Sequence, residues 1–158
     1  MVHNVRGIPV YYEQYGEGKP ILCLHGCPVD HRLMTGCLEP IFNKMTGYRR
    51  IYIDYAGLGK TPSADWIKNA DDMLELIKEF IDGIIPDENF LIIGESYGGY
   101  LTLGLIRDIK TRIDGVMLVC PAIHHNTPSK WHPEKQILWK SKDFGSMIND
   151  ADVEGFLN

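Results

Sequence analysis

The sequence predicts an α/β fold in which a parallel β-sheet carries helices on both faces. Short apolar runs, suited to buried strands, alternate four times with segments whose apolar residues recur at helical spacing. Glycine and proline residues separate these segments, as they do in loops. Strands that alternate with helices form right-handed parallel crossovers, which place helices on both sides of the sheet. The 158 residues suit one domain of ordinary size.

Each expected element has its own sequence signal. Two extended segments, residues 4–10 and 10–15, surround a turn at Arg6-Gly7. The buried strands are short apolar runs, expected at residues 21–24, 50–55, 90–93 and 116–119. The helices have apolar residues three and four positions apart, expected at residues 31–45, 66–84 and 97–109. Ser63 is expected to cap the second of these helices.

Composition and charge argue against several classes of function. The net charge is −5 and the basic residues do not cluster, which argues against a nucleic-acid partner. No stretch approaches the roughly 18 apolar residues that a membrane-spanning helix needs, so we expect no membrane partner. The N-terminus lacks the pattern of a secretory signal peptide. We therefore expect a cytoplasmic protein whose four cysteines are reduced.

The cysteine pattern does not favour a metal site. Cys23 and Cys27 have His25 between them, but no second pair of ligands follows at zinc-like spacing. We therefore expect neither a bound metal nor an organic cofactor.

The strongest functional signal surrounds Ser96. Gly94-x-Ser96-x-Gly98 directly follows an expected buried strand and directly precedes an expected helix, the context that a nucleophile elbow requires. A serine in this tight turn projects its hydroxyl away from the sheet, and the flanking glycines avoid clashes. The helix start also offers free N–H groups to a developing oxyanion. The sequence therefore predicts Ser96 as a nucleophile, with a chance structural turn as the alternative.

A second segment, His25-Gly26-Cys27-Pro28, follows the first expected parallel strand. It resembles the oxyanion loop of the α/β-hydrolase superfamily. The resemblance implies that the backbone N–H groups of Cys27 and Tyr97 are the two oxyanion donors. It also implies that His25, Gly26 and Pro28 shape the loop, with His25 a structural residue rather than a catalytic one.

A third segment, residues 54–61, begins with Asp54 and resembles the Asp-x-x-Gly-x-Gly-x-Ser/Thr segment of the same superfamily. The resemblance implies that Asp54 has a structural role in the turn beside the active site. The three segments each follow a parallel strand, where active sites of such sheets are expected. The elbow is also similar to those of proline iminopeptidase-like hydrolases and serine carboxypeptidases.

The resemblance also implies residues that this chain does not supply. In the superfamily an acid and then a histidine follow the serine along the chain. No acidic residue stands at residues 120–123, and residues 124–158 resemble the beginning of a helical lid. We therefore expect a C-terminally truncated hydrolase, with residues 1–123 as the front part of its core. Three later histidines are alternative bases, although solvated loop positions are the preferred interpretation: His124, His125 and His132.

The sequence thus predicts a serine hydrolase scaffold for a small-molecule carboxylic ester or a small amide or peptide, acting through an acyl-enzyme at Ser96. We expect low or no turnover from this chain, because the acid and the base are missing. The alternative is a non-catalytic binding or oligomerising module on the same fold. Residues 116–119 are expected to form an apolar sheet edge, which predicts a strand-paired or domain-swapped homo-oligomer.

Overall fold

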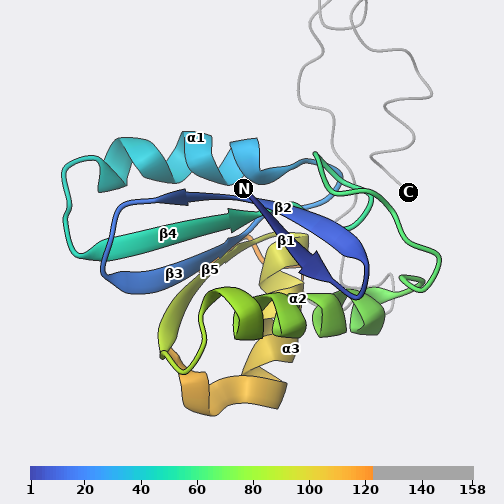
Figure 1. Ribbon diagram of the computed structural model, residues 1–158. Helices are drawn as coiled ribbons and strands as arrows, with labels where there is room; N and C mark the ends of the chain where they lie inside the picture. Colours follow the sequence, from blue (N-terminus) through green and yellow to red (C-terminus); the bar gives the residue numbers. More distant parts are fainter. Residues whose placement is uncertain (123–158) are drawn as a thin grey trace, which may run out of the picture. The chain divides into compact units, whose positions relative to one another are not determined.

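A computed structural model describes residues 1–122, which form a β-sheet with helices on both faces (Figure 1). The strands are β1 (Val2–Val5), β2 (Ile8–Tyr15), β3 (Lys19–Leu24), β4 (Tyr48–Ile53), β5 (Phe90–Glu95) and β6 (Ile113–Val119). The helices are α1 (His31–Phe42), α2 (Ala70–Ile84) and α3 (Tyr97–Ile109), followed by a short 3-10 helix at Lys110–Arg112. The lid segment predicted at residues 124–158, with its three histidines, lies outside the described residues.

The strand order places the loops of interest side by side. The order across the sheet is β1-β2-β4-β3-β5-β6. β1 and β2 form an antiparallel hairpin and β2 pairs antiparallel with β4, whereas β3, β4, β5 and β6 are parallel. The predicted parallel sheet with an N-terminal hairpin is therefore confirmed. Because β3 and β5 are neighbours, the loop after β3 and the turn after β5 meet at the carboxyl edge of the sheet.

Two apolar layers hold the helices against the sheet. α1 covers one face, and α2 with α3 covers the other (Figure 1). Successive strand residues point to opposite faces, so each strand contributes to both layers. In β3, Leu22 and Leu24 join the layer that contains Phe80 of α2, whereas Ile21 and Cys23 join the layer under α1. This burial on both faces explains why the parallel strands read as continuous apolar runs.

The start of α2 corrects one prediction. Ser63 does not cap this helix, which begins at Ala70 rather than at residue 66. Asn69 is the cap, and its side chain accepts a hydrogen bond from the Asp72 amide at 3.0 Å. The Asp72 carboxylate in turn accepts a hydrogen bond from the Lys68 amide at 2.9 Å. This reciprocal pair satisfies the amides of Lys68 and Asp72 where the helix begins.

Two other bounds differ from the prediction. The hairpin turns at Arg6 and Gly7, whose φ angles of 48° and 87° suit a tight hairpin turn, so β1 ends before them. α1 ends at Phe42 rather than at residue 45, and Pro40 lies in its last turn. Pro40 has no amide hydrogen, so α1 lacks the hydrogen bond that this residue would otherwise donate to the carbonyl four residues earlier.

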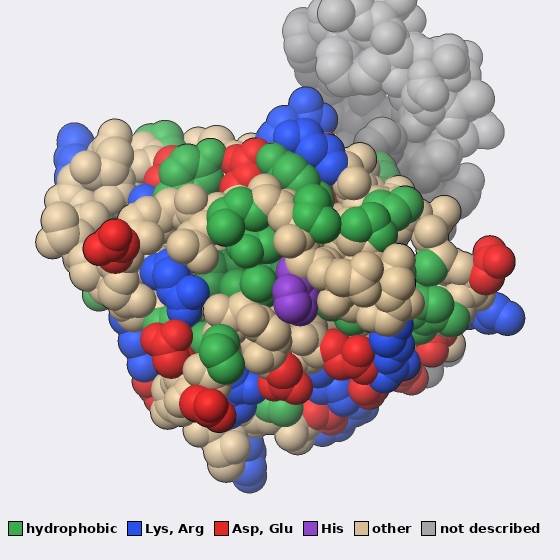
Figure 2. Space-filling model, viewed as in Figure 1, with side chains coloured by type: hydrophobic (Ala, Val, Ile, Leu, Met, Phe, Trp, Pro, Cys, Tyr) green, Lys and Arg blue, Asp and Glu red, His purple; other side chains and the backbone are tan. Residues whose placement is uncertain are grey.

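Charged side chains of both signs lie on the face of the molecule seen in Figure 2. On the face seen in Figure 2, acidic and basic side chains are interspersed, and basic side chains form no broad patch. Among the described helices, none has the length and apolar content that crossing a bilayer requires.

Candidate active site

Ser96 lies in a strained turn between β5 and α3. Its φ of 49° and ψ of −112° are unusual for a residue with a side chain, a conformation that costs about 1–3 kcal/mol. The Ser96 amide donates to the Val119 carbonyl of β6 at 3.0 Å. The Ser96 carbonyl accepts hydrogen bonds from the amides of Tyr100 at 3.1 Å and Ala122 at 2.9 Å. The neighbouring strand and the following helix together hold this turn in place.

The two glycines around Ser96 are required by close packing. A Cβ on Gly94 would lie 2.7 Å from the Gly98 carbonyl oxygen and would also collide with Thr102 Oγ1. A Cβ on Gly98 would collide with the Leu24 carbonyl at the end of β3. Thr102 Oγ1 donates to the Gly98 carbonyl at 2.7 Å, which fixes the first turn of α3. The helix therefore approaches the strand ends so closely that only glycine fits at these positions.

The loop after β3 lies directly against this turn. A Cβ on Gly26 would lie 3.0 Å from Ser96 Cβ and would collide with Glu95 Oε2. Cys27 follows in an exposed position, and Tyr97 opens α3. Within residues 1–122, no carbonyl accepts a hydrogen bond from the amide of Cys27 or Tyr97. The structure thus brings the two predicted oxyanion donors to the neighbourhood of Ser96.

His25 supports the loop from inside. Its side chain is fully buried, and its ring packs against Tyr55 with the centroids 4.1 Å apart. Its Nδ1 lies 2.6 Å from the Gly26 carbonyl, which assigns the proton to Nδ1. Burial lowers the pKa of His25, so the ring is neutral at pH 7. Tyr55 donates to the His25 carbonyl at 2.9 Å, so the ring and the backbone both serve to shape the loop.

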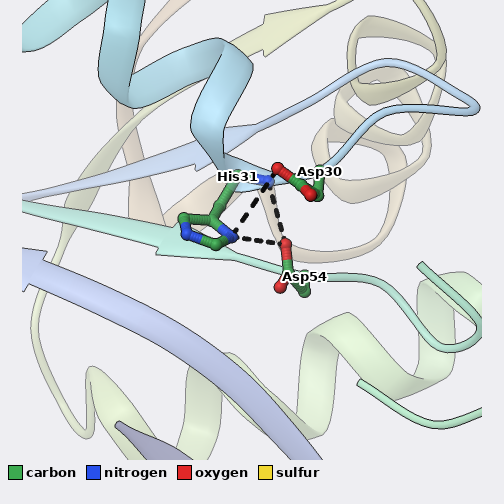
Figure 3. Close-up of side chains that lie close together, drawn as sticks. All are labelled: Asp30, His31 and Asp54. Carbon is green, nitrogen blue, oxygen red and sulfur yellow. Dashed lines mark hydrogen bonds and ion pairs between the residues drawn. The ribbon is translucent and has the colours of Figure 1, made fainter. Parts of the chain in front are cut away.

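Asp54 anchors the far end of the same loop (Figure 3). Its buried carboxylate accepts hydrogen bonds from the amide and from Nδ1 of His31, both at 2.8 Å, and from the Lys60 amide at 2.9 Å. His31 Nε2 lies 3.1 Å from Glu13 Oε1 on β2. Because His31 is the first residue of α1, these bonds hold the end of the loop in one position. This geometry supports a structural role for Asp54.

The cluster in Figure 3 also has the proximity of a metal site. Asp30, His31 and Asp54 each offer a ligand atom, and these atoms lie within 4.8 Å of one another. The polar atoms of these three residues already have partners within the protein. Asp30 pairs with Arg32 at 2.7 Å, and Asp54 accepts a hydrogen bond from His31. The Arg32 guanidinium holds the pKa of Asp30 far below its usual range. The cluster is therefore satisfied by its own protons, and we assign it a structural role.

The sequence alone does not indicate that His31 and Glu13 contact Asp54. Both lie far from Asp54 in the chain, and no spacing rule relates the three residues. The one local signal is that Asp30, a good helix cap, directly precedes His31.

Comparison with known proteins agrees with this architecture. Residues 19–150 match the α/β-hydrolase fold family. The chain is 28% identical over 102 residues to 2-hydroxy-6-oxo-6-(2'-aminophenyl)hexa-2,4-dienoic acid hydrolase of Metapseudomonas resinovorans, covering 65% of this chain and 35% of that protein. It is 27% identical over 104 residues to pimeloyl-[acyl-carrier protein] methyl ester esterase of Legionella pneumophila (strain Corby), covering 66% and 38%. A solved alpha/beta superfamily hydrolase from Oenococcus oeni PSU-1 is 29% identical with a TM-score of 0.70, covering 94% and 60%.

The chain therefore belongs to the α/β-hydrolase fold family. The predicted fold class is confirmed, and the similar proteins include hydrolases and esterases. The chain spans 35% and 38% of the length of the two curated relatives described above.

Proposed function

We propose that this chain carries the nucleophile part of a serine hydrolase that cleaves carboxylic esters or small amides. The observation that carries the proposal is the turn at Ser96, with its left-handed φ of 49° between a buried strand and a helix. The esterase and the hydrolase among its relatives support the same reaction class.

The reaction would proceed through an ester of Ser96. Ser96 Oγ attacks the carbonyl carbon, and a new C–O bond forms while the carbonyl oxygen becomes an oxyanion. The amides of Cys27 and Tyr97 donate to that oxyanion, and one such donor typically contributes about 10²–10³ in rate. The bond to the leaving group then breaks, and the leaving alcohol or amine takes the proton that Ser96 released. Water hydrolyses the acyl-enzyme in the same way.

This reaction needs a base for the Ser96 proton. Within residues 1–122 the loop histidine does not meet this need, because the ring of His25 is fully buried, and so is Nε2, the nitrogen left to accept a proton. We propose that the acid and the base come from outside residues 1–122. The described part alone should therefore have low or no turnover, although the oxyanion donors and substrate binding can leave residual catalysis.

A fluorophosphonate probe tests the proposal. An activated Ser96 should bond covalently to the probe, so that mass spectrometry of the digested full chain finds the adduct on the Ser96 peptide. Ser96→Ala should abolish this adduct, whereas Ser63→Ala, a change outside the elbow, should leave it unchanged. A wild-type chain that takes up no probe would instead favour the alternative, a non-catalytic binding module on this fold.

We also propose a cytoplasmic location. All four cysteines carry free thiols, and the thiols at Cys27, Cys37 and Cys120 are exposed. Exposed free thiols persist in a reducing compartment. Cell fractionation with an antibody to the chain tests this, and recovery from an oxidising compartment would contradict it.

A further inference from the structure

Tyr55, the residue after Asp54, lies where the loop after β3 meets the turn at Ser96. Its side chain is fully buried, and its hydroxyl donates a hydrogen bond to the His25 carbonyl at 2.9 Å. Its ring also packs against the His25 ring, with the centroids 4.1 Å apart. Tyr55 is therefore fixed to the loop by both its hydroxyl and its ring.

The same ring contacts the start of α3. Its edge-to-face contact with the Tyr97 ring has a centroid distance of 6.0 Å and an interplanar angle of 88°. Aromatic pairs in this arrangement attract each other beyond the effect of burial alone. One side chain therefore connects both predicted oxyanion donors: Tyr97 directly, and Cys27 through His25, two residues earlier in the loop.

The peptide groups on either side of Gly26 depend on this contact. A peptide group is planar, so the Gly26 carbonyl and the Cys27 amide share one orientation. Nδ1 of His25 lies 2.6 Å from that carbonyl, and the Tyr55 ring supports the His25 ring. The preceding peptide group, which contains the His25 carbonyl, is held by the Tyr55 hydroxyl. Tyr55 thus restrains a glycine whose own backbone dihedrals are unusually free.

The Tyr55 hydroxyl is a permanent donor in this position. Burial raises its pKa well above the ordinary value of 10.0, and three neighbouring side chains raise the pKa further: Tyr97, Glu95 and Cys27. The hydroxyl therefore keeps its proton at neutral and moderately basic pH. These three neighbours come from the loop after β3 and from the turn after β5, so Tyr55 lies between the two.

We propose that Tyr55 is a positioning residue that sets the placement of both oxyanion donors relative to Ser96. It is buried and acts through the peptide groups around Gly26 and through the Tyr97 ring. The proposal deepens the proposed function and rests on it, because the two amides contribute to catalysis only if Ser96 is the nucleophile.

Two matched probes measure the oxyanion donors separately from the rest of the site. They are a fluorophosphonate and its thiono analogue, in which sulfur replaces the phosphoryl oxygen. With either probe, Ser96 Oγ attacks phosphorus, an O–P bond forms, the P–F bond breaks and fluoride leaves, while the serine proton passes to a base. Sulfur is a weak hydrogen-bond acceptor, so the ratio of the oxo to the thiono labelling rate reports on the amide donors.

Tyr55→Phe keeps the ring and removes the hydroxyl. In the full chain it should lower the oxo-to-thiono ratio about tenfold, a part of the roughly 10²–10³ in rate that one oxyanion donor contributes. Tyr52→Phe is the matched control, because Tyr52 is also fully buried and its hydroxyl donates to Glu39 of α1 at 2.5 Å. Both variants lose one buried hydrogen bond, but Tyr52→Phe should keep the wild-type ratio. A wild-type ratio in Tyr55→Phe, or an equal fall in both variants, would overturn the proposal.

A measurement without chemistry separates failure of this proposal from failure of the proposed function. Amide nitrogen relaxation gives the order parameter of the Cys27 N–H bond, which is about 0.85 for rigid backbone and below about 0.6 for flexible backbone. It should fall in Tyr55→Phe and stay at the wild-type value in Tyr52→Phe. If neither probe labels the wild-type chain while this fall is seen, the proposed function is wrong and the support of the loop by Tyr55 stands. One order parameter shared by all three chains would overturn the role of Tyr55, whatever the probes show.

Discussion

At the residue scale, one buried histidine links three distant parts of the chain. His31 is 3% exposed, and its two ring nitrogens face Asp54 Oδ1 and Glu13 Oε1 at 2.8 and 3.1 Å. Each contact joins a ring nitrogen to a carboxylate oxygen at hydrogen-bond distance. The cluster ties β2, the end of β4 and the start of α1 together, and with them the loop that lies against Ser96.

Replacing His31 should destabilise this linkage. In His31→Ala the buried Asp54 carboxylate loses one donor and Glu13 loses another, which should lower the free energy of unfolding by about 1–3 kcal/mol. Urea denaturation followed by circular dichroism measures the change. Arg32→Ala, at the neighbouring but exposed position, should cost less, since exposed ion pairs contribute little to stability. Equal effects of the two changes would contradict the importance assigned to His31.

The same cluster predicts how stability depends on pH. A hydrogen bond from Tyr15, and then others from Tyr11 and His31, hold the pKa of Glu13 below its ordinary value of 4.5. Glu13 therefore contributes stability that is complete above about pH 4.5 and is lost as the pH falls through the lower folded-state pKa. Urea midpoints measured between pH 7 and pH 3 should fall less steeply for Glu13→Gln than for the wild-type chain. An unchanged slope would show that Glu13 does not contribute.

At the scale of elements, the active-site turn depends on the distance between α3 and the ends of β3 and β5. The collisions described for Gly94 and Gly98 involve backbone atoms, which cannot move aside without shifting a strand or the helix. The position of Ser96 is therefore a consequence of how closely one helix packs on two strands, in addition to its own φ.

Substitution at Gly98 tests this packing. Gly98→Ala should destabilise the fold by about 1–3 kcal/mol and reduce fluorophosphonate labelling of Ser96, because the added methyl pushes α3 away from β3. The matched control is Gly36→Ala in α1, where a Cβ meets no atom within 4 Å. That change should stabilise the chain by about 0.5–1 kcal/mol through helix propensity. Thermal unfolding and labelling of both variants decide the matter, and a Gly98→Ala chain that labels normally would refute the argument.

At the scale of the whole molecule, β6 forms one edge of the described sheet. Val116, Met117 and Leu118 on this strand are 41%, 54% and 38% exposed. An apolar strand with an unpaired backbone edge invites pairing with another chain. We propose that two copies of the chain associate through β6, as the apolar run predicted.

A charge on β6 should weaken this association. Met117→Lys places a cation on the edge strand, where natural proteins use lysine to prevent pairing. Sedimentation velocity over a range of concentrations should show a larger species for the wild-type chain and less of it for the variant. Ile41→Lys on α1, a position that is 59% exposed, is the control and should behave as wild type. A wild-type chain that stays monomeric at high concentration would disprove the proposal.

By itself, the sequence determined the order of the elements and the place of the elbow. α3 was expected at residues 97–109 and the structure has it at Tyr97–Ile109, because an apolar strand, a glycine-flanked serine and a periodic helix are local signals. The predicted start of α2 at residue 66 was wrong. Trp66 and Ile67 continue the helical spacing of apolar residues, although they pack against the core from a loop. The spacing of apolar residues indicates which residues are buried. It does not distinguish a buried residue in a loop from one in a helix.

Only the tertiary structure decided which distant side chains meet. The contacts of His31 with Asp54 and Glu13, and the burial of Glu95 against Gly26, join residues that are remote in the sequence. Periodicity and turn propensity act over a few residues and cannot specify such contacts. They arise from the crossover connections that set β5 beside β3 and β2 beside β4, so the surroundings of Ser96 belong to the folded chain as a whole.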